Sequence, residues 1–158
     1  MQSAHFLTLC PVSPLVSWLG RPDPRIWGGQ DGSNFLIHLV DDDDAVRTTL
    51  ARLIRLSGYE VREYASGAEL LQSADHLDSG CILLDLNMPD ADGIAVNQSL
   101  KARSIDIPVI LVTGAGDREI SPHRADVAEV LHKPFRRADL LSVLDRFIGP
   151  PNAEVTGQ

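Results

Sequence analysis

The sequence has few cysteines and no closely spaced pair of them. Cys10 and Cys81 are the two cysteines of the 158-residue chain, and they lie far apart with no Cys-x-x-Cys spacing. Secreted domains that depend on disulfides, and redox or zinc motifs, use closely spaced cysteines in even numbers. We therefore expect a reduced, cytoplasmic protein without structural disulfides.

The sequence also lacks a cluster of Lys and Arg. It carries 14 Lys and Arg against 22 Asp and Glu, which gives a formal net charge of −8. Binding to a nucleic acid backbone depends on clustered basic side chains that replace counterions on the phosphates. We therefore expect no nucleic acid partner.

No apolar run is long enough to span a membrane. The most apolar segment near the start is 6–19, which Pro11 and Pro14 interrupt and which no Lys or Arg precedes. A spanning helix needs about 20 apolar residues, and a signal peptide begins with basic residues. We therefore expect neither a membrane segment nor export.

The N-terminal segment 1–33 differs from the remainder of the chain. Residues 20–33 are rich in Gly, Pro and polar residues and have no apolar period, which is typical of a linker or of disorder. We expect segment 1–33 to lie outside the folded domain. The alternative is a docking segment anchored by Trp18 and Trp27.

The remaining chain has the size and composition of one globular domain. Hydrophobic residues make up 44% of the sequence and charged residues 23%, which is ordinary for a globular protein. One domain and one core fit this length. We expect the domain to cover residues 34–149 and residues 150–158 to form a short tail.

Short apolar runs alternate with helical patterns along this domain. The predicted strands are 35–40, 59–64, 81–84, 108–112 and 127–132, and the predicted helices follow Asp44, Ser66, Gly93 and residue 139. Such alternation predicts βαβ units and a parallel α/β sheet with helices on both faces. Between Asp117 and residue 127 the apolar positions are sparse and Pro122 intervenes, so we expect a short or frayed helix there.

Local signals give the helix boundaries. Asp44 is predicted to cap the first helix, with Asp43 as a loop residue, and Gly58 to close it. Ser66 and Glu69 have the spacing of a capping box for the second helix.

Polar residues follow four of the predicted strands at the points where those strands end. The run Asp41–Asp44 follows the first strand, Asp85 the third, Thr113 the fourth and Lys133 the fifth. Because parallel neighbours share their carboxyl edge, these side chains are predicted to converge on one site. An Asp run alone would indicate only a solvated loop, but the combined pattern points to chemistry.

The chemistry predicted for this site is phosphoryl transfer with a divalent cation. Two carboxylates about 4 Å apart repel by about 4 kcal/mol at an effective dielectric near 20, and Mg²⁺, which prefers oxygen ligands, removes that cost. Asp85 is then the candidate nucleophile that forms an aspartyl phosphate. Lys133 would neutralise one phosphoryl oxygen, and Thr113 would donate a hydrogen bond to another.

Two other motifs do not fit. The segment that contains Asp90, Asp92 and Gly93 lacks the later Glu of a calcium loop, and 114–116 lacks the third Gly of a dinucleotide fingerprint.

Five stretches of the sequence resemble one known family. They are 40–47 (Val-Asp-Asp-Asp-Asp-Ala-Val-Arg), 83–89 (Leu-Leu-Asp-Leu-Asn-Met-Pro), 92–93 (Asp-Gly), 112–114 (Val-Thr-Gly) and 133–135 (Lys-Pro-Phe). They are similar to the response-regulator receiver domain, the CheY-like family, most of all its FixJ-type branch. The resemblance covers about 34–149. It implies a flavodoxin-like, doubly wound five-stranded parallel sheet in strand order 2-1-3-4-5, here in a single-domain form.

The resemblance also implies roles for the strand-end residues. Asp85 resembles the phospho-acceptor, Thr113 the switch hydroxyl and Lys133 the phosphate-binding lysine. The implied Mg²⁺ ligands are Asp41, Asp42, Asp85 and the carbonyl of Asn87. The family's phosphoryl donor is a phosphohistidine on a histidine kinase or phosphotransfer protein. The downstream protein partner is not implied, and dimerisation on phosphorylation stays open.

Two features depart from the family pattern. The family commonly has Tyr or Phe three residues before the lysine, whereas this chain has Val130. The segment between Thr113 and Lys133 is also short, lacks the family's Gly-Ala pair and contains Pro122. We therefore expect the chemistry to be retained while the surface that signals phosphorylation differs.

Three functional hypotheses follow. The leading one is a phospho-acceptor that is not a turnover enzyme and that switches protein contacts. The first rival is a haloacid-dehalogenase-like phosphatase with Asp41 and Asp43 as the catalytic pair. The second rival, suggested by Val130, is a degenerate receiver that binds partners without phosphorylation.

Overall fold

The computed structural model describes residues 36–78, 80–114 and 120–150. The expected extension 1–33 with its two tryptophans, Asn34 and residue 35, Cys10, and the tail beyond residue 150 lie outside the described residues. None of the described helices reaches the length and apolar character of a bilayer-spanning segment.

In the described part of the chain, five parallel strands form one sheet. The strands are β1 (Leu36–Val40), β2 (Glu60–Tyr64), β3 (Gly80–Asp85), β4 (Val109–Thr113) and β5 (Glu129–His132). Their order is β2-β1-β3-β4-β5, and every neighbouring pair is parallel. The predicted α/β class and strand order are therefore confirmed, and the bounds differ from prediction by one or two residues.

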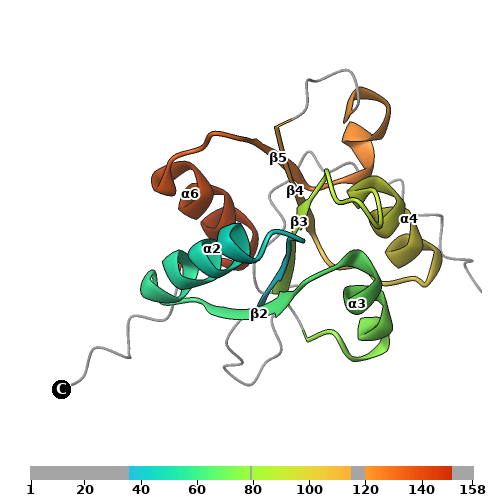
Figure 1. The fold of residues 1–158 in the computed structure, drawn as a ribbon, viewed down its shortest axis with the longest axis horizontal. Coiled ribbons are helices and arrows are strands. Elements are labelled where there is room, and N and C mark those ends of the chain that lie inside the picture. Colours follow the sequence, from blue (N-terminus) through green and yellow to red (C-terminus); the bar gives the residue numbers. More distant parts are fainter. Residues whose placement is uncertain (1–35, 79, 115–119, 151–158) are drawn as a thin grey trace, which may run out of the picture.

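Helices cover both faces of the sheet (Figure 1). α2 (Asp44–Leu56) and α6 (Arg137–Ile148) lie on one face, and α3 (Gly67–Gln72) and α4 (Gly93–Ala102) lie on the other. Two 3₁₀ helices complete the described elements, η1 (Ala74–His76) and η2 (Ser121–Asp126). This is the doubly wound arrangement in which the strands' carboxyl edge carries the site.

Alternating side chains of the strands build two separate cores. In β1, Ile37 and Leu39 pack with α2 and α6, whereas Val40 packs with the α3 and α4 side. In β3, Leu83 and Leu84 divide in the same way, and each is fully buried. Because the central strands are buried on both faces, they read as continuous apolar runs in the sequence.

The first helix begins one residue earlier than predicted. Asp43 is the N-cap, because one of its carboxylate oxygens accepts hydrogen bonds from the backbone N–H groups of Ala45 (2.9 Å) and Val46 (3.1 Å). Asp44 is already helical and pairs with Arg47. The prediction that Asp44 caps the helix was therefore wrong: the cap is Asp43, which lies before the helix as predicted.

The other helix boundaries follow their predicted signals. α2 ends at Leu56, and Gly58 behind it has φ 92°, a backbone conformation that glycine adopts without strain. Ser66 caps α3 by accepting from the N–H of Glu69 at 3.1 Å, and the Glu69 carboxylate accepts from the N–H of Ala65 at 2.7 Å. The predicted capping box is present, with its return bond shifted by one residue.

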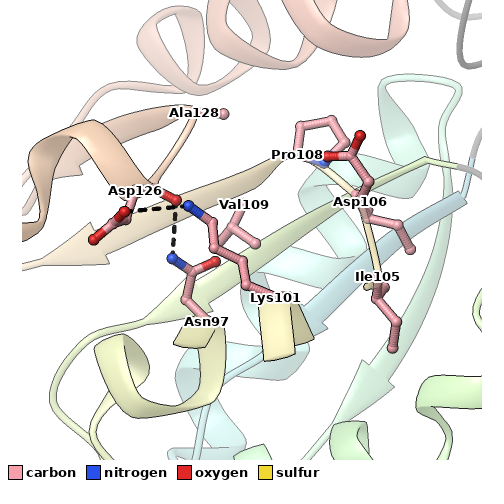
Figure 2. Close-up of a pocket in the computed structure, with 9 residues that line it drawn as sticks. Asn97, Lys101, Ile105, Asp106, Pro108, Val109, Asp126 and Ala128 are labelled. Carbon is pink, nitrogen blue, oxygen red and sulfur yellow. Dashed lines mark hydrogen bonds and ion pairs between the residues drawn. The ribbon is translucent and has the colours of Figure 1, made fainter. Parts of the chain in front are cut away.

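The segment predicted as a short or frayed helix contains η2. Pro122 lies in its first turn, where the missing N–H is tolerated. Figure 2 shows how α4 holds its far end: the buried Asn97 side chain donates to the carbonyl oxygen of Asp126 at 3.0 Å, and Lys101 pairs with the carboxylate of Asp126 at 3.3 Å. Residues 115–119 lie outside the described part of the chain.

Among the described residues, the interior contains one histidine and one cysteine. His38 in β1 is fully buried, with Nδ1 3.1 Å from the Tyr64 hydroxyl and Nε2 3.1 Å from the carbonyl oxygen of Asp78. Burial lowers the pKa of His38, because it disfavours the charged form of the ring. Cys81 in β3 is a fully buried free thiol, and burial raises its pKa to about 12.

Candidate functional site

Four strands place their polar end residues at one edge of the sheet. β3 ends at Asp85, β4 ends at Thr113, Asp41 follows β1 directly and Lys133 follows β5. The register pairs Asp85 with residue 112 and Thr113 with residue 132, so these ends lie level. The edge therefore gathers the residues that the sequence separates, as predicted from the parallel topology.

Three carboxylates meet at this edge. Carboxylate oxygens of Asp41, Asp42 and Asp85 lie within 4.8 Å of one another. Asp41 is 3% exposed and Asp85 7% exposed, whereas Asp42 is open to solvent. Burial raises the pKa of Asp41, while the backbone N–H of Asp43 lowers it and the charge of Asp85 raises it. The cluster is therefore an electrostatic cost that a cation offsets.

Lys133 supplies the positive charge next to Asp85. Its Nζ lies 3.5 Å from Oδ1 of Asp85 and 3.9 Å from Oδ2 of Asp41. Its backbone N–H donates to the carbonyl oxygen of Thr113 at 2.7 Å, and a cis peptide bond joins it to Pro134. The Thr113 side chain is fully buried beside this bond. The ammonium group is therefore fixed where it can neutralise an anion attached to Asp85.

The loop behind Asp85 is held by backbone contacts. The N–H of Asn87 points at Oδ1 of Asp85 at 3.4 Å, and the N–H of Leu86 donates to the carbonyl oxygen of Val112 at 2.9 Å. Gly93 lets α4 begin close to this loop, because a Cβ atom at Gly93 would meet the carbonyl oxygen of Asp85 at 2.7 Å. Asn87, predicted to offer its carbonyl to a cation, lies exposed in this loop, two residues after Asp85.

Arg47 is a contributor to the site that the sequence reasoning did not single out. Its Nη1 donates to the carbonyl oxygen of Asp41 at 2.8 Å, and its Nε lies 3.8 Å from the Glu63 carboxylate. It also pairs with Asp44. Arg47 therefore fastens the chain after β1 to α2 and β2. Nothing in the apolar pattern distinguishes it from Arg52 or Arg55 on the same helix.

The donor set fits Mg²⁺. Octahedral Mg²⁺ binds oxygen at about 2.1 Å, so its ligand atoms lie roughly 3 to 4 Å apart, which is close to the spacing of the carboxylates of Asp41, Asp42 and Asp85. A carbonyl oxygen from the loop and water would complete the shell. Within the described residues, this is the cluster of acidic side chains that meets such a spacing.

The comparisons with known proteins agree with this geometry. Residues 37–145 match the response regulator receiver domain family. The chain is 36% identical over 115 residues to the transcriptional regulatory protein FixJ of Azorhizobium caulinodans, a match over 72% of this chain and 54% of FixJ. It is 34% identical over 111 residues to the response regulator protein TmoT of Ectopseudomonas mendocina, over 69% of this chain and 50% of TmoT. The chain thus spans about half the length of the curated relatives it matches.

Solved structures give the same result. The crystal structure of FixJ-N has a TM-score of 0.69 and 29% identity, and the match covers 73% of this chain and 94% of that one. The receiver domain of the sensor histidine kinase PA1611 from Pseudomonas aeruginosa PAO1, solved with a magnesium ion coordinated in its active-site cleft, has a TM-score of 0.66 and 32% identity over 74% of this chain and 99% of that one. With its parallel sheet, its acidic cluster and this match over more than half its length, the chain belongs to the response regulator receiver domain family.

Proposed function

We propose that Asp85 accepts a phosphoryl group from a phosphohistidine of a histidine kinase or phosphotransfer protein. A carboxylate oxygen of Asp85 forms the new O–P bond as the P–N bond to the imidazole breaks, and the imidazole takes up a proton on leaving. The observation that carries this proposal is the position of Asp85 within 3.5 Å of the Lys133 ammonium and beside two further carboxylates.

The surrounding residues have separate roles in this proposal. Asp41, Asp42, Asp85 and the carbonyl of Asn87 hold the cation, which offsets charge on the transferring group when it is bound. Lys133 neutralises one phosphoryl oxygen, and the hydroxyl of Thr113 donates to another. Phosphoryl transfer depends mainly on such positioning and charge neutralisation. Arg47 positions Asp41 through its backbone carbonyl.

The product changes the charge at one edge of the sheet. An aspartyl phosphate carries about −1.5 to −2 charges in place of the single negative charge of the Asp85 carboxylate, so this edge becomes more negative. The altered charge shifts a conformational equilibrium toward a state that binds a downstream protein. In this proposal the protein is a cytoplasmic signalling module without a turnover substrate. Dimerisation on phosphorylation is one form that the new contact can take.

The two rival functions fit the site less well. A haloacid-dehalogenase-like phosphatase would direct Asp41 and Asp43 at the substrate, but the Asp43 carboxylate is engaged as the cap of α2. A degenerate receiver would have lost part of the site, whereas the acidic cluster and Lys133 are all present and adjacent. Val130 lies in β5 outside this cluster, so its departure from the family pattern does not touch the acceptor.

Intact mass spectrometry tests the proposal. After incubation with acetyl phosphate and Mg²⁺, the protein is expected to gain the mass of one phosphoryl group, and the Asp85→Asn variant is expected to gain none. The matched control is Asp90→Asn, an exposed aspartate of the same loop, which should be phosphorylated like the original protein. An equal adduct on Asp85→Asn, or none on the original protein, refutes the proposal.

A second arm separates the acceptor from the phosphatase. With a phosphate monoester and Mg²⁺, we expect no steady release of inorganic phosphate. Continuous turnover that depends on Asp43 would establish the phosphatase instead.

A further inference from the structure

The backbone of Asp41 is held on both sides by neighbouring elements. Its N–H donates to the carbonyl oxygen of Tyr64 in β2 at 3.2 Å, and its own carbonyl oxygen accepts from Nη1 of Arg47 in α2 at 2.8 Å. The Asp41 carboxylate accepts from the N–H of Asp43 at 2.9 Å. The peptide group between Asp41 and Asp42 is therefore fixed by the Arg47 guanidinium.

That peptide group leads directly to Asp42, the exposed member of the acidic cluster. The carboxylates of Asp41 and Asp85 are enclosed by their surroundings, whereas Asp42 is open to solvent. Rotation of the peptide group would swing the Asp42 carboxylate relative to the other two. The hydrogen bond from Arg47 therefore restricts the spacing of the cation ligands.

Arg47 is itself held in place by β2. Its side chain is 13% exposed, and its Nε lies 3.8 Å from Oε2 of Glu63, a side chain that is 29% exposed. The other oxygen of Glu63, Oε1, lies 2.9 Å from Nη1 of Arg55. Asp44 also pairs with Arg47 but is 87% exposed, so that pair contributes little. Glu63 is therefore the anion that holds the direction of the Arg47 guanidinium.

A fixed ligand spacing favours the smaller of two divalent cations. Mg²⁺ binds oxygen at about 2.1 Å in near-ideal octahedral geometry, whereas Ca²⁺ binds at about 2.3 to 2.6 Å in flexible shells. Ligands that can move apart accommodate Ca²⁺, and ligands held close together favour Mg²⁺. Both ions carry two charges, so a neighbouring charge outside the shell acts on them almost equally.

We propose that the ion pair of Arg47 and Glu63 makes the site selective for Mg²⁺ over Ca²⁺, because it fixes the peptide group that carries Asp42. Arg47 and Glu63 are then positioning residues that do not touch the cation. This role rests on the cation site of the proposed function but not on phosphoryl transfer to Asp85. It is therefore tested by cation binding without a phosphoryl donor.

The probes are Mg²⁺ and Ca²⁺, each titrated into the ¹⁵N-labelled full chain at constant ionic strength and followed by NMR. The original protein is expected to bind Mg²⁺ more tightly than Ca²⁺. Arg47→Gln should weaken Mg²⁺ binding about tenfold, as is typical for loss of a group that orients a metal ligand, and Ca²⁺ binding by no more than about twofold. Glu63→Gln should lower the preference for Mg²⁺ about threefold, because its pair with Arg47 is long and partly exposed.

The sign of the change separates positioning from charge. Loss of the Arg47 cation reduces repulsion, so by charge alone Arg47→Gln would strengthen the binding of both ions. Weaker binding of Mg²⁺ therefore requires a change in ligand position. Arg47→Lys keeps the charge but not the planar fork that reaches both partners, so it should lose the preference for Mg²⁺ as Arg47→Gln does.

Arg55→Gln is the matched control. It removes the other cation that binds Glu63, at a side chain whose further bond is to the carbonyl oxygen of Val61, and it should leave the ratio of the two dissociation constants within about twofold of the original. The NMR spectrum of each variant reports directly whether the fold is retained. Because Glu63 is partly exposed, its variant decides the matter even if Arg47→Gln fails to fold.

Several results overturn the proposal. Equal changes for Mg²⁺ and Ca²⁺ in Arg47→Gln and Glu63→Gln would mean that the pair acts through charge or overall stability. A preference for Mg²⁺ that survives in Arg47→Lys would show that the charge suffices. Equal or tighter binding of Ca²⁺ by the original protein, or no binding of Mg²⁺, removes the selectivity. The phosphoryl adduct on Asp85 is measured separately, so failure of the acceptor role is distinguishable from failure of the ion pair.

Discussion

The carboxyl edge around Asp85 and the face formed by η2 and β5 are built in different ways. At the edge, Asp41 and Asp85 lie directly at the ends of buried strands, and their carboxylates are almost fully enclosed. On the face, the contacts are made between exposed side chains such as Arg124 and Arg146. Strand ends can be altered little without loss of the sheet, whereas surface contacts can change independently of the core. The strand-end site is therefore tied to the core, whereas the contacts on the η2 and β5 face can change without disturbing it.

Replacing one basic side chain in each region should give the largest contrast, measured as the rate of phosphorylation. Lys133→Gln is expected to slow formation of the phosphoryl adduct by roughly 100-fold or more, since a preorganised charge at a transferring group contributes on this scale. Arg124→Gln removes a cation that lies on the η2 and β5 face and should leave the rate nearly unchanged. The rates are measured by intact mass over time with acetyl phosphate and Mg²⁺. Similar slowing by both variants would mean that the two regions are not separable.

Adding a methyl group at Gly93 should destabilise the protein, whereas adding one at Gly114 should not. Gly93→Ala would place Cβ 2.7 Å from the carbonyl oxygen of Asp85, whereas Cβ at Gly114 would meet nothing within 4 Å. We expect Gly93→Ala to lower the free energy of unfolding by roughly 1 to 3 kcal/mol through overpacking, and Gly114→Ala to change it by less than about 0.5 kcal/mol. Urea denaturation measures both. Equal stability of the two variants would show that α4 can move away from the Asp85 loop without cost.

The hydrogen bond from Asn97 that anchors η2 should contribute less to stability. Asn97→Leu keeps the side-chain volume but removes the donor to the carbonyl oxygen of Asp126, and that carbonyl can turn to water because Asp126 is exposed. We expect a loss of about 1 kcal/mol in the free energy of unfolding and faster amide hydrogen exchange in η2. The matched variant Gln98→Leu, on the exposed side of α4, should show neither. Unchanged exchange in Asn97→Leu would contradict the role of α4 as the anchor.

The smallest expected effect is the contribution of His38, in β1, to the pH dependence of stability. Burial lowers the pKa of His38 from its ordinary value of 6.5, with Arg62 adding to this and Asp78 opposing it, and Tyr64 is the other polar group at the ring. The unfolded chain therefore binds the proton more readily, so the free energy of unfolding should decrease as the pH falls below 6.5. His38→Leu should flatten this dependence relative to His76→Leu, at an exposed histidine of η1. Parallel pH profiles for the two variants would show that His38 binds its proton equally well in the folded and unfolded states.

The sequence predicted the carboxyl edge well because topology alone brings its residues together. Once the apolar runs are identified as parallel strands, Asp41, Asp85, Thr113 and Lys133 must share one edge. Their separation along the chain is then no obstacle. The same reasoning could not distinguish Asp43 from Asp44 as the cap of α2, because both are good capping residues and only the backbone conformation decides between them.

Long-range contacts between polar side chains were beyond prediction. Arg47 is one of several arginines on α2, and its bond to the carbonyl of Asp41 depends on how α2 packs. A pocket beside Val130 is a second case, since its volume depends on the placement of η2 relative to β5. The sequence indicated only that an aromatic residue common in the family is replaced by Val130. The effect of this replacement on the surface depends on how η2 and β5 pack together.

The buried thiol of Cys81 can report how often the centre of the sheet opens to solvent. It is enclosed in β3 between β1 and β4, and with a pKa of about 12 it carries almost no reactive thiolate at neutral pH. In a Cys10→Ser background, the rate of labelling by a thiol reagent therefore counts the moments at which the centre of the sheet is exposed. A slower labelling rate of Cys81 would likewise show that phosphorylation, a cation or a bound partner stabilises the fold. No probe needs to be added to the protein surface.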